Sequence, residues 1–162
     1  MRWVTRFGTD APVRVLDLGG RDVNGTPRSL FPNAVVYRVL DIADGPGVDV
    51  IANAATWTPD GEYDVVLSTE CFEHAAEWPR ICATAFKALA EGGLFVATMA
   101  GPGRPVHSGV DGGPVLYAGE HYGNVDPDAL RAVLAEVGFT DVTVDQQWAP
   151  CDVRCAARKA RP

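Results

Sequence analysis

Two short β-rich runs that each end at an aspartate constrain the fold more than any other feature of the sequence. Val13–Leu16 leads into Asp17, which is followed after one residue by two glycines. Val35–Leu40 leads into Asp41 and then into a turn rich in glycine. Apolar runs that lead into glycine loops are typical of buried parallel strands. Because the carboxyl ends of parallel strands meet at one edge of a sheet, we expect both acids at the edge where such folds bind ligands.

The rest of the chain alternates strand-like and helix-like segments. The patterns predict strands at 48–52, 63–68 and 94–99, a short crossover helix within 26–33, and helices at 79–90, with Gly92 as C-cap, and 126–138. The last two strand-like runs, 140–148 and 153–158, are joined by too few residues for a parallel crossover, so they should form an antiparallel hairpin. The predicted fold class is therefore α/β, a doubly wound, mostly parallel, Rossmann-like sheet that ends in an antiparallel hairpin.

The length of the chain and one long irregular segment indicate how the chain is organised. A chain of 162 residues fits a single domain, so we expect residues 1–162 to enclose one core. Residues 100–124 are rich in Gly and Pro and exceed the usual length of a structureless connection, about 12 to 15 residues. Such long segments are often functional, and this one is a candidate substrate loop.

Composition and charge exclude several classes of protein. The net charge of −7 disfavours a nucleic-acid substrate, since such binders carry basic patches that neutralise phosphates. The N-terminus lacks the apolar run of a signal peptide, and no later stretch is long and apolar enough to span a membrane, so we expect a cytoplasmic protein without a membrane partner. In that compartment the four cysteines would be free thiols, and because no CxxC or neighbouring histidine completes a zinc set, no metal site is expected.

The glycine loop after the first strand indicates a bound cofactor, but not a dinucleotide. Residues 15–25 read VLDLGGRDVNG, in which glycines let the backbone approach a ligand closely. The dinucleotide fingerprint GxGxxG fails because Arg21 and Asp22 stand at the second glycine position. Asp41 follows Asp17 by 24 residues, where a carboxylate can accept both hydroxyls of a ribose. The alternative interpretation is that both acids only cap turns.

With these residues in view, the chain resembles the class I, Rossmann-like, S-adenosylmethionine-dependent methyltransferases of the small-molecule type. The resemblance covers nearly the whole chain and rests on the order and spacing of several short motifs. These motifs are Val15-Leu16-Asp17-Leu18-Gly19, Leu40-Asp41-Ile42, Tyr63-Asp64-Val65-Val66, Glu73-His74 and Gly92-Gly93. Two departures accompany them, since the usual GxGxG is reduced and the helices that normally precede the first strand are absent.

The resemblance implies S-adenosyl-L-methionine as the cofactor and assigns residues to it. The loop at Gly19 and Gly20 would lie against the methionine moiety, Asp41 would hold the ribose, and Asn53 would stand near the adenine. A Cβ at Gly19 would then project into the space of the cofactor. The residues implied to bind the cofactor are Asp17, Gly19, Gly20, Asp41, Ile42, Asn53, Ala54, Ser68, Thr69 and Glu70.

The acceptor side is predicted from position rather than from a motif. His74 follows the fourth strand, where the resemblance places the acceptor, although packing is an alternative role for it. With the N-terminal helices absent, acceptor recognition is left to residues 100–124, to a second copy in a homodimer, or to neither. We expect Arg104 and Tyr122 beside the acceptor, and His107 or His121 as general base if the acceptor is a hydroxyl, since histidine accepts protons near neutral pH.

The predicted function is transfer of a methyl group from S-adenosylmethionine to an oxygen or nitrogen of a small-molecule or glycan-like acceptor. Orientation of the two reactants would carry most of the catalysis. The alternative is a catalytically idle Rossmann-like partner or regulatory subunit, which the reduced glycine loop suggests. A nucleotide-linked oxidoreductase is disfavoured by the failed dinucleotide fingerprint and by the terminal hairpin.

Overall fold

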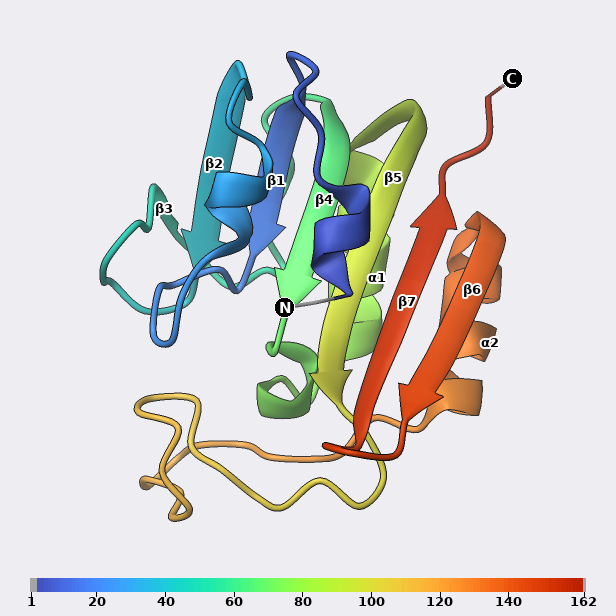
Figure 1. Ribbon diagram of the computed structural model, residues 1–162. Helices are drawn as coiled ribbons and strands as arrows, with labels where there is room; N and C mark the ends of the chain where they lie inside the picture. Colours follow the sequence, from blue (N-terminus) through green and yellow to red (C-terminus); the bar gives the residue numbers. More distant parts are fainter. Residues whose placement is uncertain (1–2, 162) are drawn as a thin grey trace.

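The computed structural model describes residues 3–161, and within them seven strands form one sheet in the order β3-β2-β1-β4-β5-β7-β6 (Figure 1). Strands β1 to β5 are parallel, and β7 lies antiparallel between β5 and β6. In chain order the elements, with η for 3₁₀-helices, are η1 Val4–Phe7, β1 Arg14–Leu18, η2 Pro27–Leu30, β2 Val36–Asp41, β3 Val50–Ile51, β4 Tyr63–Thr69, η3 Phe72–His74, α1 Trp78–Ala88, β5 Leu89–Ala100, α2 Pro127–Val137, β6 Thr140–Gln147 and β7 Asp152–Arg158.

The fold class predicted from the sequence is confirmed. The first five strands are parallel, and β6 and β7 form the antiparallel hairpin that the short connection between them required. Helix α2 begins and ends where its capping residues indicated. The Asp126 carboxylate accepts hydrogen bonds from the backbone N–H groups of Asp128 and Ala129, and Gly138 has a φ of 108°, which suits glycine.

The two faces of the sheet are covered very differently (Figure 1). Helices α1 and α2 pack on one face over buried residues such as Leu16 and Phe95. Among the described residues the other face carries η1 and η2, and Val4 of η1 together with Phe31, just after η2, covers Val15. The short crossover predicted within 26–33 is thus a single 3₁₀-helix, Pro27–Leu30. This face has a smaller core.

The junction of α1 and β5 differs from the prediction. The helix ends at Ala88 instead of residue 90, and β5 begins at Leu89, five residues earlier than expected. Leu89 is fully buried and has extended backbone, because its side chain belongs to the core while its main chain pairs with Tyr63. Gly92, with a φ of 78°, therefore lies within β5 at an irregularity of the pairing and is not the helix cap. Tertiary burial has overridden the helical pattern here.

One edge of the sheet collects the features that the sequence marked as functional. The carboxyl ends of β1, β2 and β4 meet there, and η3 and the irregular segment 101–126 lie across the same edge (Figure 1). Strand β3 is shorter than predicted and pairs only through Val50 and Ile51. Among residues 3–161, no helix combines the length and the apolar character that crossing a bilayer demands.

Candidate functional site

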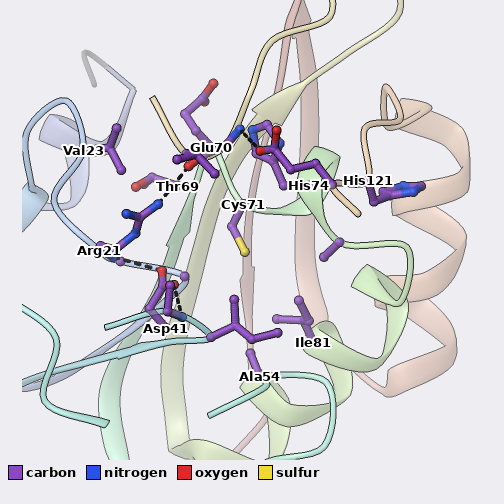
Figure 2. A pocket seen from close by; sticks show the side chains of 18 of the residues that line it. Arg21, Val23, Asp41, Ala54, Thr69, Glu70, Cys71, His74, Ile81 and His121 are labelled. Atoms are coloured by element: carbon purple, nitrogen blue, oxygen red, sulfur yellow. Dashed lines mark hydrogen bonds between the residues drawn. The ribbon is translucent and has the colours of Figure 1, made fainter. Parts of the chain in front are cut away.

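A cavity of about 730 Å³ opens at the carboxyl edge of the sheet, beneath the segment 107–121 (Figure 2). Its size falls in the range of sites for cofactors and small ligands, about 300 to 1,000 Å³. It is lined by residues that follow β1, β2, β3 and β4, by the start of α1, and by the long segment after β5. Cofactor-binding residues predicted from the sequence that line it are Gly19, Gly20, Asp41, Ile42, Asn53, Ala54, Thr69 and Glu70.

Asp41 stands at the end of β2 with its carboxylate turned into the cavity (Figure 2). Its Oδ2 accepts a hydrogen bond of 3.2 Å from the backbone N–H of Arg21, and its Oδ1 accepts one of 3.0 Å from Ala43. Each oxygen keeps a further lone pair, since a carboxylate offers about four acceptor positions. The two loops that flank the site therefore hold this acid in place without saturating it.

Gly19 and Gly20 bring the backbone of the β1 loop against its neighbours more closely than a side chain permits. Gly19 has a φ of 72°, and a Cβ there would lie 2.3 Å from the Cys71 sulfur. This differs from the prediction, in which the Cβ would have entered the space of a cofactor. A Cβ on Gly20 would lie 2.5 Å from Cγ of Asp17. Both glycines are thus needed by the protein itself, whatever the cavity holds.

Asp17 lies beneath the site and does not line the cavity. It is completely buried, and its Oδ2 accepts a hydrogen bond of 2.9 Å from the Tyr37 hydroxyl. Its Oδ1 has no hydrogen-bond partner among the described residues. Burial raises the pKa of Asp17 to about 6, although the bond from Tyr37 opposes this rise. Asp17 could therefore act on a cofactor only through Gly20, which lies against Asp17 and lines the cavity.

The raised pKa of Asp17 predicts how a neutral replacement affects stability. Because the folded-state pKa lies above the unfolded one, its contribution to stability is present below about pH 4 and is lost as the pH rises through about 6. We therefore expect the free energy of unfolding of Asp17→Asn, relative to that of the natural protein, to increase by about 2 kcal/mol as the pH rises from 4 to 7. Urea unfolding at both pH values measures this, with exposed Asp44→Asn as the control. A stability difference that does not change with pH would contradict the assignment.

Asn53, Ala54 and Ile42 form the wall of the cavity beside Asp41. Oδ1 of Asn53 accepts a hydrogen bond of 2.8 Å from the N–H of Ala55, which fixes the turn and leaves the amide group of the side chain as a donor. Ala54 is nearly buried, whereas Ile42 is 73% exposed at the rim. An apolar wall with one amide donor suits a flat heteroaromatic ring.

The three residues predicted at the end of β4 separate in the structure. Ser68 is buried outside the cavity lining, and its hydroxyl donates to the Leu18 carbonyl at 2.9 Å, which ties β4 to β1. Thr69 and Glu70 line the cavity. Glu70 has a φ of 53°, and its carboxylate accepts a hydrogen bond of 2.8 Å from the Thr98 hydroxyl.

Four side chains from η3 and the segment after β5 form a compact group at the far end of the cavity. The rings of His74 and His107 lie 5.0 Å apart, and Tyr122 packs against them with centroid distances of 5.6 and 5.0 Å. Glu73 is fully buried beside them, with one carboxylate oxygen 3.9 Å from Nε2 of His107. His74 and His107 line the cavity, while Tyr122 supports them from outside the lining.

The other two predicted acceptor residues differ in position. His121 is exposed and lines the cavity; its main chain lies beside His74, but its ring points away from that residue (Figure 2). Arg104 lies outside the lining and forms an ion pair with Asp152 at the start of β7. Arg104 thus anchors the long segment to the sheet.

The segment 101–126 contains no helix or strand but is held by specific hydrogen bonds. The Glu120 carboxylate accepts from the hydroxyl of buried Ser108 and from the N–H of Gly109, both at 2.9 Å. The Arg21 guanidinium donates to the Gly109 carbonyl at 3.0 Å, which links the β1 loop to this segment above the cavity. Neither Arg21 nor Glu120 was predicted from the sequence as a site residue. The only signal for Arg21 was its place in the glycine loop, and Glu120 carried none.

The fold and this site define a Rossmann-like domain with a ligand cavity at the carboxyl edge of its sheet. The sequence matches the family model described as methyltransferase domain over residues 1–144, and the chain belongs to this family. No curated protein matches the sequence closely enough to count as a relative.

Solved structures of methyltransferases share the fold. Haemonchus contortus phosphoethanolamine N-methyltransferase 2, in complex with S-adenosyl-L-methionine, aligns with a TM-score of 0.73 at 15% identity, covering 98% of this chain and 51% of that one. This chain therefore spans about half the length of that enzyme. Burkholderia thailandensis 1,6-didemethyltoxoflavin-N1-methyltransferase aligns at 0.71 with 17% identity and 97% and 74% coverage. A Mesorhizobium loti S-adenosylmethionine-dependent methyltransferase aligns at 0.66 with 16% identity and 96% coverage of both chains.

Proposed function

We propose that the chain catalyses methyl transfer from S-adenosyl-L-methionine to a nitrogen or oxygen of a small-molecule acceptor. The observation that supports this most is the cavity itself. Its lining includes the Asp41 carboxylate, the apolar wall around Ala54 and the glycine loop, all at the carboxyl edge of the sheet where such folds bind ligands. Family membership and the cofactor named in the Haemonchus and Mesorhizobium structures support the same reading.

The residues present fit the cofactor in a definite orientation. Asp41 would accept the ribose hydroxyls, and the wall made by Ala54 and Ile42 would cover the adenine, with the amide of Asn53 as its polar contact. The methionine portion would then extend along Gly20 toward Glu70. This direction leads to the far end of the cavity, so the acceptor would meet the methyl group near His74.

The protein's part in the reaction is to bind, orient and exclude water. The cofactor, when bound, supplies an electrophilic methyl group on a sulfonium centre. Arg21 and Glu120 hold the segment 101–126 over the cavity, which limits entry of water and fixes the approach of the acceptor. For a hydroxyl acceptor we propose His121 as the general base, because it is exposed to the cavity whereas His107 faces Glu73.

A small acceptor fits this site better than a macromolecular one. Much of the far end is bounded by the segment 107–121, and the net charge of −7 opposes binding of nucleic acid. The proposed partner is thus a small molecule with an amine or hydroxyl group.

Calorimetry with S-adenosylmethionine and S-adenosylhomocysteine tests the proposal. We expect both to bind with one site per chain, and radiolabelled methyl transfer to follow for at least one member of a panel of small amines and hydroxyl compounds. Absence of binding by either compound to well-folded protein would overturn it and favour the idle-domain alternative. Binding without transfer to any panel member would also favour that alternative.

Replacement of Asp41 is expected to weaken cofactor binding strongly. Asp41→Ala removes charge-assisted hydrogen bonds to the ribose, a loss of about 1.5 to 3 kcal/mol, or roughly ten to a hundredfold in affinity. Asp44→Ala, three residues away, exposed and outside the cavity lining, is the matched control and should bind normally. Equal affinities of the two variants in calorimetry would remove Asp41 from the site.

A further inference from the structure

We propose that Glu73, His74 and His107 form a binding site for a divalent transition-metal ion at the acceptor end of the cavity. One ligand atom from each residue can be chosen so that all three lie within 4.8 Å of one another. The metal site itself stands independently of the methyl-transfer reaction. The role given to it below rests on the proposed function.

The strongest observation is the buried carboxylate of Glu73. Its side chain has no exposed surface, and neither oxygen has a close hydrogen-bond partner among the described residues, although the backbone N–H groups of Glu73 and Ala100 lie near enough to lower the pKa of the carboxyl. A buried polar group without a partner costs free energy, and native proteins rarely tolerate one. Nδ1 of His74 is also buried without a partner in the same set of residues. Two adjacent residues of the group thus each carry a buried polar atom without a close partner.

The hydrogen bond of His107 fixes which ring nitrogen faces Glu73. Nδ1 of His107 lies 3.2 Å from the Pro105 carbonyl, and because a carbonyl only accepts, Nδ1 must carry the proton. In the neutral ring Nε2 then presents a lone pair toward the Glu73 oxygen at 3.9 Å. Two acceptors face each other with no donor between them. Metal-binding histidines are typically held in this way, with the second ring nitrogen donating to a backbone carbonyl.

A proton on Glu73 is the competing explanation. Burial, together with the nearby charge of Glu70, raises the pKa of Glu73 to about 8, while the backbone N–H groups of Glu73 and Ala100 and the charge of Arg104 oppose the rise. A protonated carboxyl could remain buried. However, the 3.9 Å between the Glu73 oxygen and Nε2 of His107 is too long for a hydrogen bond. A proton on Glu73 would therefore not bond the two side chains to each other.

The donor set indicates the kind of ion. Two imidazoles and one carboxylate suit Zn²⁺, Co²⁺ or Fe²⁺, whereas Mg²⁺ and Ca²⁺ prefer oxygen ligands. Neighbouring ligands of tetrahedral zinc lie about 3.4 Å apart, so the separation of 3.9 Å needs only a small closure. Tyr122 packs on both imidazoles, and its hydroxyl donates a hydrogen bond of 3.0 Å to the Pro105 carbonyl. These contacts hold the two rings in their relative orientation.

Three protein ligands leave coordination positions free, as in catalytic rather than structural sites. Because His74 and His107 line the cavity, these positions would be open to an acceptor. For a hydroxyl acceptor, the ion would bind the oxygen to be methylated and lower its pKa, and the bound oxygen would keep a lone pair for the methyl group. An amine acceptor would have to bind the ion through another heteroatom, because its nitrogen needs its lone pair for the transfer. The site would thereby select acceptors that carry a metal-binding heteroatom.

Titration of tag-free, chelator-treated protein with Zn²⁺ and Co²⁺ tests the proposal. We expect one ion to bind per chain with micromolar or tighter affinity. Bound Co²⁺ should show a visible absorption band typical of an ion with a low coordination number. Glu73→Gln and His107→Ala should each weaken binding at least about a hundredfold. The control is Glu77→Gln, since Glu77 lines the cavity but lies outside the group and pairs with Arg80.

Binding of no ion, or equal binding by Glu73→Gln, would overturn the metal site. If Glu73 instead carries a proton, Glu73→Gln should be as stable as the natural protein or more so at pH 8, and the titration should show no heat. Calorimetry with S-adenosylmethionine on the same samples separates the two proposals. Cofactor binding without metal leaves the proposed function standing, and metal binding without cofactor leaves only the metal site.

Discussion

Gly19→Val is expected to lower the free energy of unfolding by about 2 to 5 kcal/mol. Two costs add at this position. A β-branched residue at a φ of 72° is strained by about 1 to 2 kcal/mol, and the new side chain must displace Cys71, whose sulfur would lie 2.3 Å from the Cβ. Overpacking of this kind typically costs about 1 to 3 kcal/mol. Against a total stability of about 5 to 15 kcal/mol, the loss is large.

Gly47→Val provides a matched control. Gly47 has a φ of 79°, close to that of Gly19, but a Cβ there meets nothing within 4 Å. Gly47→Val should therefore show only the backbone strain, and the difference between the two variants measures the collision with Cys71. Chemical unfolding gives both values.

Restoring the space should restore part of the stability. In Gly19→Ala the collision involves both the sulfur and the Cβ of Cys71, at 2.3 and 2.7 Å. Adding Cys71→Gly removes both atoms, so the double variant should recover the steric part of the loss and keep the backbone part. A double-mutant cycle with no coupling would contradict this explanation of Gly19.

The terminal hairpin and the bounds of α2 were predictable because both follow from local rules. The four residues between 148 and 153 cannot carry a parallel crossover, and Asp126 with Gly138 marks both ends of α2. The α1–β5 junction was not predictable in the same way. The spacing of apolar residues continues past Ala88, and only the pairing of Leu89 with Tyr63 ends the helix there.

The candidate site was predictable where it depends on strand ends and not where it depends on the path of a loop. Asp41 follows directly from its place after β2, and it lines the cavity. The meeting of Glu73 with His107 joins η3 to the segment 101–126, whose course is set by contacts such as Arg104 with Asp152. No local pattern specifies those contacts. Ser68 also stands at a strand end, but its side chain lies on the buried side. Position along a strand therefore does not determine which way a side chain points.

His121→Ala is expected to reduce turnover with a hydroxyl acceptor by about a hundredfold or more while leaving cofactor affinity unchanged. General-base catalysis by a positioned side chain contributes about a hundredfold to ten-thousandfold. His121 lines the cavity and is exposed, so its ring is free to turn toward an acceptor there and to exchange its proton with solvent. It lies away from the wall around Asp41, which leaves the cofactor contacts intact (Figure 2). An amine acceptor that enters unprotonated should be affected much less, since it loses its proton after transfer.

Chemical rescue separates a base from a residue that only shapes the loop. Gly123 lies against the His121 ring, with 3.3 Å between Nε2 and the position of an added Cβ, so loss of the ring could loosen the segment 101–126. In that case kcat and KM would both change, and free imidazole would have no effect. If His121 is the base, imidazole added to His121→Gly should restore turnover in proportion to the concentration of its neutral form. Full turnover in His121→Ala, or loss only in step with unfolding, would leave orientation of the acceptor as the protein's whole contribution.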